Sequence, residues 1–285
     1  MHRMGAAHFE EVAPGIRRLL APNPSAFTFT GTQTYVVGTR DVAVIDPGPD
    51  DEAHVAHLLE ALGAAKVASI LVTHTHRDHS PASRPVAAAT GAPILGCAPL
   101  AIADDGPRAD AAFDFDYAPD VVLADGGRVA GDDWTLQAVA TPGHTSNHLC
   151  FAWPERKALF TGDHIMGWST TIVSPPDGDM AAYMASLELL LTRDDLVYYP
   201  THGPAITEPK AHVRALIAHR RMREAQILAA LQDGEGIITD MVPTLYRETD
   251  PGLYPAAARS VLAHLLDLEA QGRVTRTGEQ WRLAA

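Results

Sequence analysis

The chain has 285 residues, 46% of them hydrophobic, and carries a formal net charge of −13 at pH 7. These values are typical of a globular protein with one large domain or a core domain plus a small appendage, and they exclude a disordered chain. No apolar run approaches the roughly 18 residues that span a bilayer, and the N-terminus shows no basic segment followed by an apolar stretch. We therefore expect no membrane partner and a cytoplasmic location.

The charge is distributed unevenly along the chain. Residues 1–209 hold 12 Lys and Arg against 26 Asp and Glu, whereas residues 210–285 hold 10 against 9. A polyanion would therefore have to be bound locally. Cys97 and Cys150 are the two cysteines, and their number and spacing predict core residues rather than a disulfide framework.

The first part of the chain predicts a sheet. Short β segments are expected at 16–20, 34–37 and 41–46, separated by turns that contain Pro, Gly and Asn. Residues 52–62 then place apolar side chains at helical spacing and stop at Gly63, and residues 67–72 form an unbroken apolar run of strand length.

Three imidazoles and a carboxylate follow that strand within six positions: His74, His76, Asp78 and His79. Residues at i and i+2 of an extended segment point the same way, so His74 and His76 can bind one cation. If the chain turns after His76, the second pair can serve a neighbouring cation, and two adjacent cations can generate hydroxide at neutral pH. The alternative is a histidine-rich surface loop.

Three later strands end in the same manner. The segments 134–140, 158–160 and 196–199 are followed by His144, by Asp163 with His164, and by His202. The sequence has neither G-x-x-x-x-G-K-[ST] nor G-x-G-x-x-G, so it gives no support to a nucleotide cofactor. A helix is expected at 182–191, and the preceding loop 168–179 either overhangs the candidate site or forms a plain surface connection.

From Pro209 the composition changes. Helices are expected at 210–232, 237–247 and 254–270, followed by a hairpin at 274–283, which together suggest a winged-helix-like unit. Such units often bind nucleic acid, but the helix at the recognition position is poor in basic residues. A lid or a homodimer contact is the alternative. We predict two domains, a catalytic domain at 1–209 and a helical, winged-helix-like domain at 210–285.

The motifs together resemble a known family. T-H-x-H-x-D-H at 73–79, P-G-H-T at 142–145, G-D at 162–163 and H-G at 202–203 look like the metallo-β-lactamase superfamily. That resemblance implies an α/β fold, an αββα sandwich with the metal site at the sheet edge. The segments 23–28, 31–35, 169–171 and 183–187 and the tail resemble its lactamase-β-like protein 2 subfamily. Thr201 is a departure, because family members usually have Gly before the last histidine.

The resemblance also implies roles for individual residues. His74, His76 and His144 would bind one metal ion, Asp78, His79 and His202 the other, and Asp163 would bridge the two. The implied cofactor is two zinc ions, with iron or manganese as alternatives. His148 and His164 lie outside this set, and each would orient a ligand or, more simply, pack in the core.

Hydrolysis by a metal-bridging hydroxide is the implied reaction, with Asp78 as a catalytic residue that orients the nucleophile or carries its proton. Single-stranded RNA is one substrate implied by the subfamily, although the acidic domain would repel it. A small ester or thioester, as in glyoxalase II, is the other. β-Lactam hydrolysis is disfavoured, because lactamases with two zinc ions typically use Cys at the position of Asp163. A winged-helix regulator with a vestigial metal site is a third hypothesis.

Overall fold

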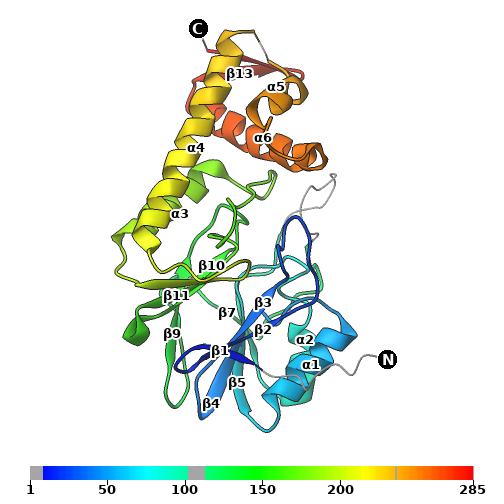
Figure 1. Cartoon of the computed structure of the whole chain (residues 1–285), viewed down its shortest axis with the longest axis vertical. Helices are drawn as coiled ribbons and strands as arrows, with labels where there is room; N and C mark the ends of the chain where they lie inside the picture. The colour runs from blue at the N-terminus through cyan, green and yellow to red at the C-terminus, as the bar shows by residue number, and fades with distance from the viewer. Residues whose placement is uncertain (1–8, 102–112, 235, 285) are drawn as a thin grey trace.

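The computed structural model describes residues 9–101, 113–234 and 236–284. Two β-sheets pack face to face, and helices cover their outer faces, α1 and α2 on one side and α3 and α4 on the other (Figure 1). This is the αββα sandwich that the family resemblance implies. A smaller lobe of helices and a hairpin follows at the C-terminal end of the described chain.

The first sheet has seven strands whose spatial order is their order in the chain. β4 and β5 pair in parallel, which requires a crossover, and α1 provides it. The bounds are β1 (Glu10–Ala13), β2 (Ile16–Leu20), β3 (Gln33–Val37), β4 (Asp41–Ile45), α1 (Glu52–Leu62), β5 (Lys66–Val72), α2 (Ser83–Thr90), β6 (Ile94–Gly96) and β7 (Val121–Val122).

The second sheet has five strands in the order β12-β11-β10-β9-β8. β9, β10 and β11 form an antiparallel meander, and β12 pairs in parallel with β11 after the crossover helix α3. The bounds are β8 (Arg128–Ala130), β9 (Thr135–Ala140), β10 (Leu149–Trp153), the 3₁₀ turn η1 (Pro154–Arg156), β11 (Ala158–Gly162), α3 (Met180–Thr192) and β12 (Val197–Pro200).

The main core lies between the two sheets. Every residue of β3, β4, β10 and β11 is buried, which explains why these segments do not alternate between apolar and polar side chains. Tyr35, Ile70, Leu136 and Phe151 are among the side chains that fill this layer. Cys97 and Cys150 are buried free thiols, as predicted.

The C-terminal lobe contains α4 (Pro209–Gln232), α5 (Ile238–Leu245), η2 (Pro251–Leu253), α6 (Tyr254–Ala270) and the hairpin β13 (Val274–Thr277) and β14 (Gln280–Leu283). Trp281 is buried in its core. The long helix α4 contributes Val213 and Ile217 to the core against the second sheet and Ile227 and Leu231 to the core of the lobe. It therefore joins the lobe to the sandwich (Figure 1).

In the described parts of the chain, no helix is both long and apolar enough to cross a membrane. β4 and β5 pair in parallel in the first sheet, and β11 and β12 do so in the second, so each pair ends at one edge of its sheet. The residues that follow these strands lie close together, so the two edges are on the same side of the sandwich. β9 runs antiparallel to β10, which runs antiparallel to β11, so β9 ends at that edge as well. The polar residues that follow these strands are thereby brought together.

Candidate metal centre

All seven side chains that the sequence analysis singled out converge at this edge. They form two groups, His74, His76, His144 and Asp163 in one, and Asp78, His79 and His202 in the other. Within each group the potential ligand atoms lie within 4.8 Å of one another, and all seven residues are buried. Residues from both sheets contribute, so the fold itself sets the geometry of the cluster.

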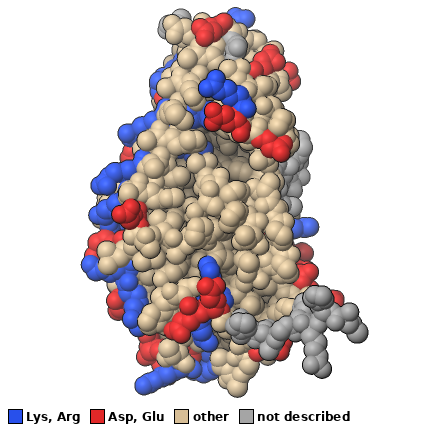
Figure 2. All heavy atoms as spheres, in the orientation of Figure 1, with Lys and Arg blue, Asp and Glu red and all other residues tan. Residues whose placement is uncertain are grey.

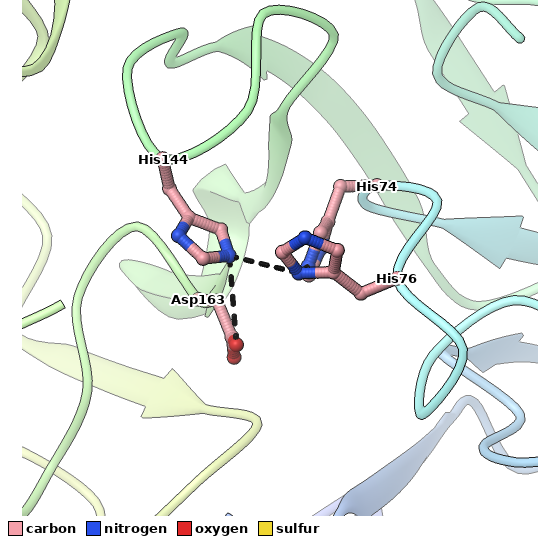
Figure 3. Close-up of side chains that lie close together, drawn as sticks. All are labelled: His74, His76, His144 and Asp163. Atoms are coloured by element: carbon pink, nitrogen blue, oxygen red, sulfur yellow. Dashed lines mark hydrogen bonds and ion pairs between the residues drawn. The ribbon is translucent and has the colours of Figure 1, made fainter. Parts of the chain in front are cut away.

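The first group directs three imidazole nitrogens at one point (Figure 3). His76 Nδ1 lies 3.0 Å from His74 Nε2 and 3.1 Å from His144 Nε2. Asp163 Oδ2 lies 3.8 Å from His144 Nε2. Three nitrogens at such distances leave little room for anything except a proton or a small cation among them.

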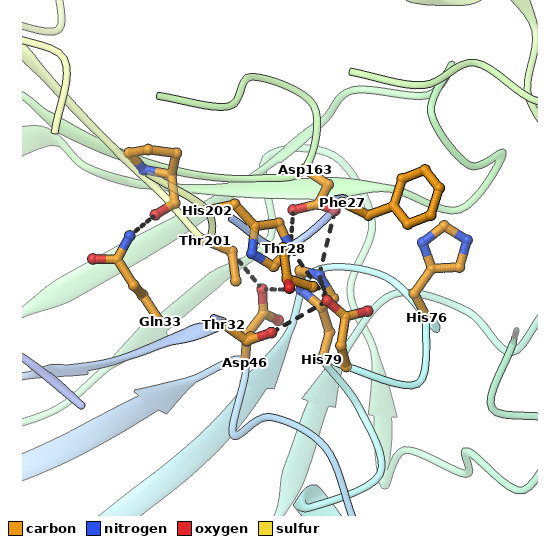
Figure 4. Close-up of polar contacts among 12 residues, drawn as sticks. Phe27, Thr28, Thr32, Gln33, Asp46, His76, His79, Asp163, Thr201 and His202 are labelled. Atoms are coloured by element: carbon orange, nitrogen blue, oxygen red, sulfur yellow. Dashed lines mark hydrogen bonds and ion pairs between the residues drawn. The ribbon is translucent and has the colours of Figure 1, made fainter. Parts of the chain in front are cut away.

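The second group is built around Asp78. Its Oδ2 lies 3.4 Å from His79 Nε2 and 3.2 Å from His202 Nε2, and it accepts a hydrogen bond of 3.2 Å from the Thr32 hydroxyl. Asp163 also faces this group, with Oδ2 3.5 Å from His79 Nε2 and Oδ1 3.3 Å from His202 Nε2. Asp163 is therefore the residue that lies between the two groups (Figure 4).

Hydrogen bonds behind the first group fix which nitrogen carries the proton. The Thr73 hydroxyl donates to Asp46 and so accepts, at 3.0 Å, from His74 Nδ1. His144 Nδ1 donates to the Ile172 carbonyl at 2.7 Å. Both rings must then present an unprotonated Nε2 to the centre, which is the tautomer that a metal ligand needs.

The second group is arranged in the same way. His79 Nδ1 donates to Asp46 Oδ2 at 2.9 Å, and His202 Nδ1 donates to the Gly31 carbonyl at 3.2 Å. Their Nε2 atoms therefore point between the carboxylates of Asp78 and Asp163 with a lone pair available for a cation.

Asp46, immediately after β4, supports both groups and was not predicted. Its carboxylate accepts from Thr73 N and Thr73 Oγ1. It also accepts from His79 Nδ1 and Thr201 Oγ1 (Figure 4). Its backbone lies in the left-handed region with φ 47°, a conformation that costs a non-glycine residue free energy and that clusters at functional sites. The signal in the sequence was a carboxylate at the end of an apolar strand, followed by Pro47-Gly48.

The carboxylates favour positive charge at this site. Burial lowers the pKa of His202, but the Asp163 and Asp78 carboxylates outweigh it and raise that pKa to about 10. Burial likewise opposes charge on His79, and the same carboxylates together with Asp46 raise its pKa well above the usual value. A cation, whether a proton or a metal ion, is therefore stabilised between these groups.

The imidazoles of the first group behave differently. Burial, followed by the neighbouring imidazoles, holds the pKa of His74 well below the ordinary value. Burial and then His144 do the same for the pKa of His76. These rings are neutral at pH 7, as ligation requires.

The donor set fits divalent metal ions. Asp163 Oδ1 and His79 Nε2 are buried, and neither makes a hydrogen bond to a residue that the structure describes. A buried polar atom without a hydrogen bond is costly, and a cation would satisfy both. Imidazole with carboxylate suits zinc, iron and manganese, so the ligands alone do not select one metal.

His148 and His164 lie behind the centre. His148 Nε2 accepts from the Asp163 backbone N–H at 3.2 Å, and its Nδ1 lies 2.9 Å from the Thr141 hydroxyl. His148 therefore positions Asp163. His164 is fully buried, and its ring packs 4.9 Å from that of Tyr183, which is a packing role.

A narrow cavity of about 30 Å³ opens from the two groups, with Phe27, Met166 and Ile172 in its walls. The loop 168–179 overhangs the site, one of the two placements expected. Thr171 Oγ1 donates to the Asp163 carbonyl at 2.6 Å, and the Ile172 carbonyl accepts from His144. The loop thus helps to hold residues of the centre.

Comparisons with known proteins agree with this architecture. A family model described as the metallo-beta-lactamase superfamily matches residues 27–202, and one described as the beta-lactamase associated winged helix domain matches residues 238–281. A protein of Drosophila melanogaster named Beta-lactamase-like protein 2 homolog is 33% identical over 279 residues, covering 92% of this chain and 91% of that protein.

A Claviceps purpurea protein named Atrochrysone carboxyl ACP thioesterase is 32% identical over 250 residues, covering 84% of this chain and 74% of that protein. The crystal structure of a beta-lactamase domain protein from Burkholderia ambifaria has a TM-score of 0.81 and 22% identity, covering 98% of this chain and 94% of that one. At that identity the match concerns the fold, including the C-terminal winged-helix lobe.

Proposed function

This chain belongs to the metallo-β-lactamase superfamily and is a metal-dependent hydrolase, and we propose that its substrates are acyl thioesters. The observation that carries the substrate class is the relative named Atrochrysone carboxyl ACP thioesterase, which aligns with 84% of this chain. A second relative with the same name, from Aspergillus chevalieri, is 31% identical over 242 residues.

In the proposed mechanism the two groups of residues would hold two divalent cations, and Asp163, which faces both groups, would contribute to both. His74, His76 and His144 would hold one cation, Asp78, His79 and His202 the other, and zinc is the metal we propose, with iron or manganese as alternatives. Such ions, when bound, lower the pKa of water and polarise a carbonyl oxygen.

The chain's own residues then orient the reaction. Asp78 lines the narrow cavity and directs Oδ2 to His79 and His202, and in this proposal its carboxylate would orient the attacking water or take its proton. Phe27, Met166 and Ile172 give this cavity apolar walls, which exclude bulk water and strengthen electrostatic interactions inside. The thiolate of the substrate is the leaving group.

Single-stranded RNA is not favoured by the charge distribution. Nucleic-acid sites need a track of Lys and Arg along the backbone of the ligand. The middle of the face in Figure 2 carries few charged side chains, whereas Lys and Arg gather along one edge, on the side of α4. Residues 1–209 also carry 26 acidic against 12 basic side chains.

A substrate panel tests the proposal. The zinc-loaded protein would be given an acyl-CoA, the same acyl group on N-acetylcysteamine, an acyl-glutathione, nitrocefin and single-stranded RNA. We expect thiol release from at least one thioester and no cleavage of RNA or nitrocefin, with Asp163→Ala as the inactive control. Cleavage of RNA with intact thioesters would overturn the assignment.

A further inference from the structure

A second, larger cavity lies beside the metal centre, between the loop 168–172 and the C-terminal lobe. Its volume is about 270 Å³, and it shares Phe27, Met166 and Ile172 with the cavity of the metal centre. Trp168 and Tyr246 provide aromatic walls, and the lobe closes the other side with residues of α4 and α6. A substrate that reaches the metal centre can therefore extend into this space.

Two arginines of α4 line the cavity and are almost completely buried. Arg220 is 3% exposed and Arg223 is 8% exposed, and residues three apart lie on the same face of a helix. Arg220 Nη2 donates to the Thr171 carbonyl, and its guanidinium lies 5.1 Å from the Tyr183 ring centroid. Arg223 Nη1 donates to the Leu245 carbonyl and, at 2.8 Å, to Gln226 Oε1, and its guanidinium lies 4.0 Å from the Tyr246 ring centroid.

Neither guanidinium has an acidic partner. Among residues 9–101, 113–234 and 236–284, no carboxylate lies within ion-pair distance of Arg220 or Arg223. The Nε of each is buried and makes no hydrogen bond to the same set of residues. Arginine stays protonated in proteins, so these are two buried positive charges. Burial of a charge without a counter-charge is costly, which favours an anion in this cavity.

The two arginines also lower the pKa values of the neighbouring histidines. Burial, then Arg220 and then Arg223, lowers the pKa of His219 to about 4. The same causes in the same order lower the pKa of His264 to about 3. Both rings are neutral at pH 7, so the two guanidiniums set the charge of the cavity.

The cavity is also connected to the metal centre by short contacts. The carbonyl of Thr171 accepts from Arg220, and the hydroxyl of the same residue donates to the Asp163 carbonyl at 2.6 Å. The next residue, Ile172, holds His144 through its carbonyl. Arg220 and Asp163 therefore both bind Thr171, so an anion held by Arg220 would lie beside the metal centre and could belong to the same substrate molecule.

We propose that this cavity binds an anionic group of the substrate, a carboxylate or a phosphate, and that Arg220 and Arg223 hold it while the thioester reaches the metal centre. The inference rests on the proposed function and adds the charge of the substrate to it. A carboxylate would belong to the acyl group, and a phosphate would belong to the thiol carrier. Guanidinium forks suit both anions, because each offers two oxygens in a plane.

The first test measures anion binding without any reaction. Inorganic phosphate and benzoate would be titrated into the metal-loaded protein by calorimetry, in wild type, Arg223→Gln and Arg221→Gln. Arg221 is the matched control, because it lies on the same helix but its side chain is 67% exposed and pairs with Glu188. We expect Arg223→Gln to weaken binding of at least one probe by about 10- to 100-fold, the size of a charged hydrogen bond, and Arg221→Gln to leave it unchanged.

Binding that is equal in all three proteins would overturn the proposal, since the anion would then be held elsewhere, for example at the metals. No binding of either probe at millimolar concentration would overturn it as well. If Arg223→Gln does not fold, Arg223→Lys replaces it in the test, because lysine keeps the buried positive charge but lacks the planar guanidinium that binds two oxygens at once. This variant should bind phosphate more weakly than wild type, and wild-type affinity would contradict the proposal.

The second test identifies which part of the substrate carries the anion. Acetyl and glutaryl thioesters would be compared on N-acetylcysteamine and on CoA. If the acyl group carries the anion, Arg223→Gln raises KM about 10-fold or more for glutaryl substrates only. If the thiol carrier holds the anion, Arg223→Gln raises KM for both CoA thioesters and for neither N-acetylcysteamine thioester. If the substitution changes the KM of none of the four thioesters, the inference is overturned while thioester hydrolysis stands. If no thioester is hydrolysed, the proposed function is overturned, and the calorimetric test still shows whether the cavity binds an anion.

Discussion

Replacing Asp46 by Asn changes one oxygen of the carboxylate to an amide nitrogen, although four hydrogen bonds are donated to that carboxylate. Oδ1 accepts from Thr73 N at 2.9 Å. Oδ2 accepts from Thr73 Oγ1 at 2.8 Å, from His79 Nδ1 at 2.9 Å and from Thr201 Oγ1 at 3.2 Å. An amide has one acceptor oxygen, so in either orientation its NH₂ group faces at least one N–H or O–H donor.

We expect this substitution to cost about 2–4 kcal/mol of folding stability, because a charge-assisted bond is weakened and a buried donor loses its acceptor. If the NH₂ group faces His79, that ring must accept at Nδ1 and carry its proton on Nε2, where the metal ion would bind. Loss of such a supporting hydrogen bond weakens metal affinity by about 10- to 100-fold. The affected metal would be the one that we propose is held by Asp78, His79 and His202.

The assay is chelator competition followed by elemental analysis of Asp46→Asn and of Asp195→Asn. Asp195 is a matched control, because it is buried and accepts from Arg193 at 2.6 Å and 3.0 Å but lies outside the metal centre. We expect Asp46→Asn to lose about one equivalent of metal at a chelator concentration that wild type and Asp195→Asn withstand. Equal retention in all three proteins would show that Asp46 does not set the state of His79.

Three further predictions concern the centre and the C-terminal lobe. Asp163→Ala should lose nearly all turnover while His148→Ala loses much less, measured at equal metal content, and equal turnover would refute the role of Asp163 between the metals. Gly143→Ala should lower stability by at least about 2 kcal/mol in urea titrations, because its φ is 138° and a Cβ would lie 2.3 Å from Tyr183 Cα; unchanged stability would contradict this packing. Burial and the two arginines lower the pKa of His264 to about 3, so between pH 6.5 and that value the unfolded chain binds the extra proton. His264 alone should therefore lower stability by about 1.4 kcal/mol per pH unit below 6.5, and His264→Gln should reduce the total slope by that amount in unfolding experiments at pH 7 and pH 5.

Local patterns predicted much of the fold. α1 was expected at its observed bounds, because Val55, Leu58 and Leu62 repeat at helical spacing and Gly63 ends the helix with positive φ. The expected hairpin 274–283 and helix 254–270 also match the structure. α2 was missed, since Ser83–Thr90 is short and rich in alanine, with a weak apolar face. β10 was missed because five consecutive buried residues show no alternation.

Long-range partners explain what the sequence analysis did not find at the site. The side chains that were expected to converge do so, because the polar residues that follow β5 in the first sheet and β9, β11 and β12 in the second meet at one edge of the sandwich. Asp46 was missed, since its partners Thr73, His79 and Thr201 lie 27, 33 and 155 positions away. The middle of the expected helix 210–232 carries Arg220 and Arg223 inward, because α4 packs against the core of the second sheet and against the core of the lobe. Periodicity alone gave no sign of that burial.

Thiol release from an acyl-CoA thioester, followed while metal-free protein is titrated with zinc, tests the central claim most directly. Two groups of buried ligands with Asp163 between them predict that activity rises with added zinc and levels off at two equivalents. Asp163→Ala should stay inactive throughout the titration. Full hydrolysis by the metal-free protein, or none at two bound equivalents, would contradict the account of a metal-dependent thioester hydrolase.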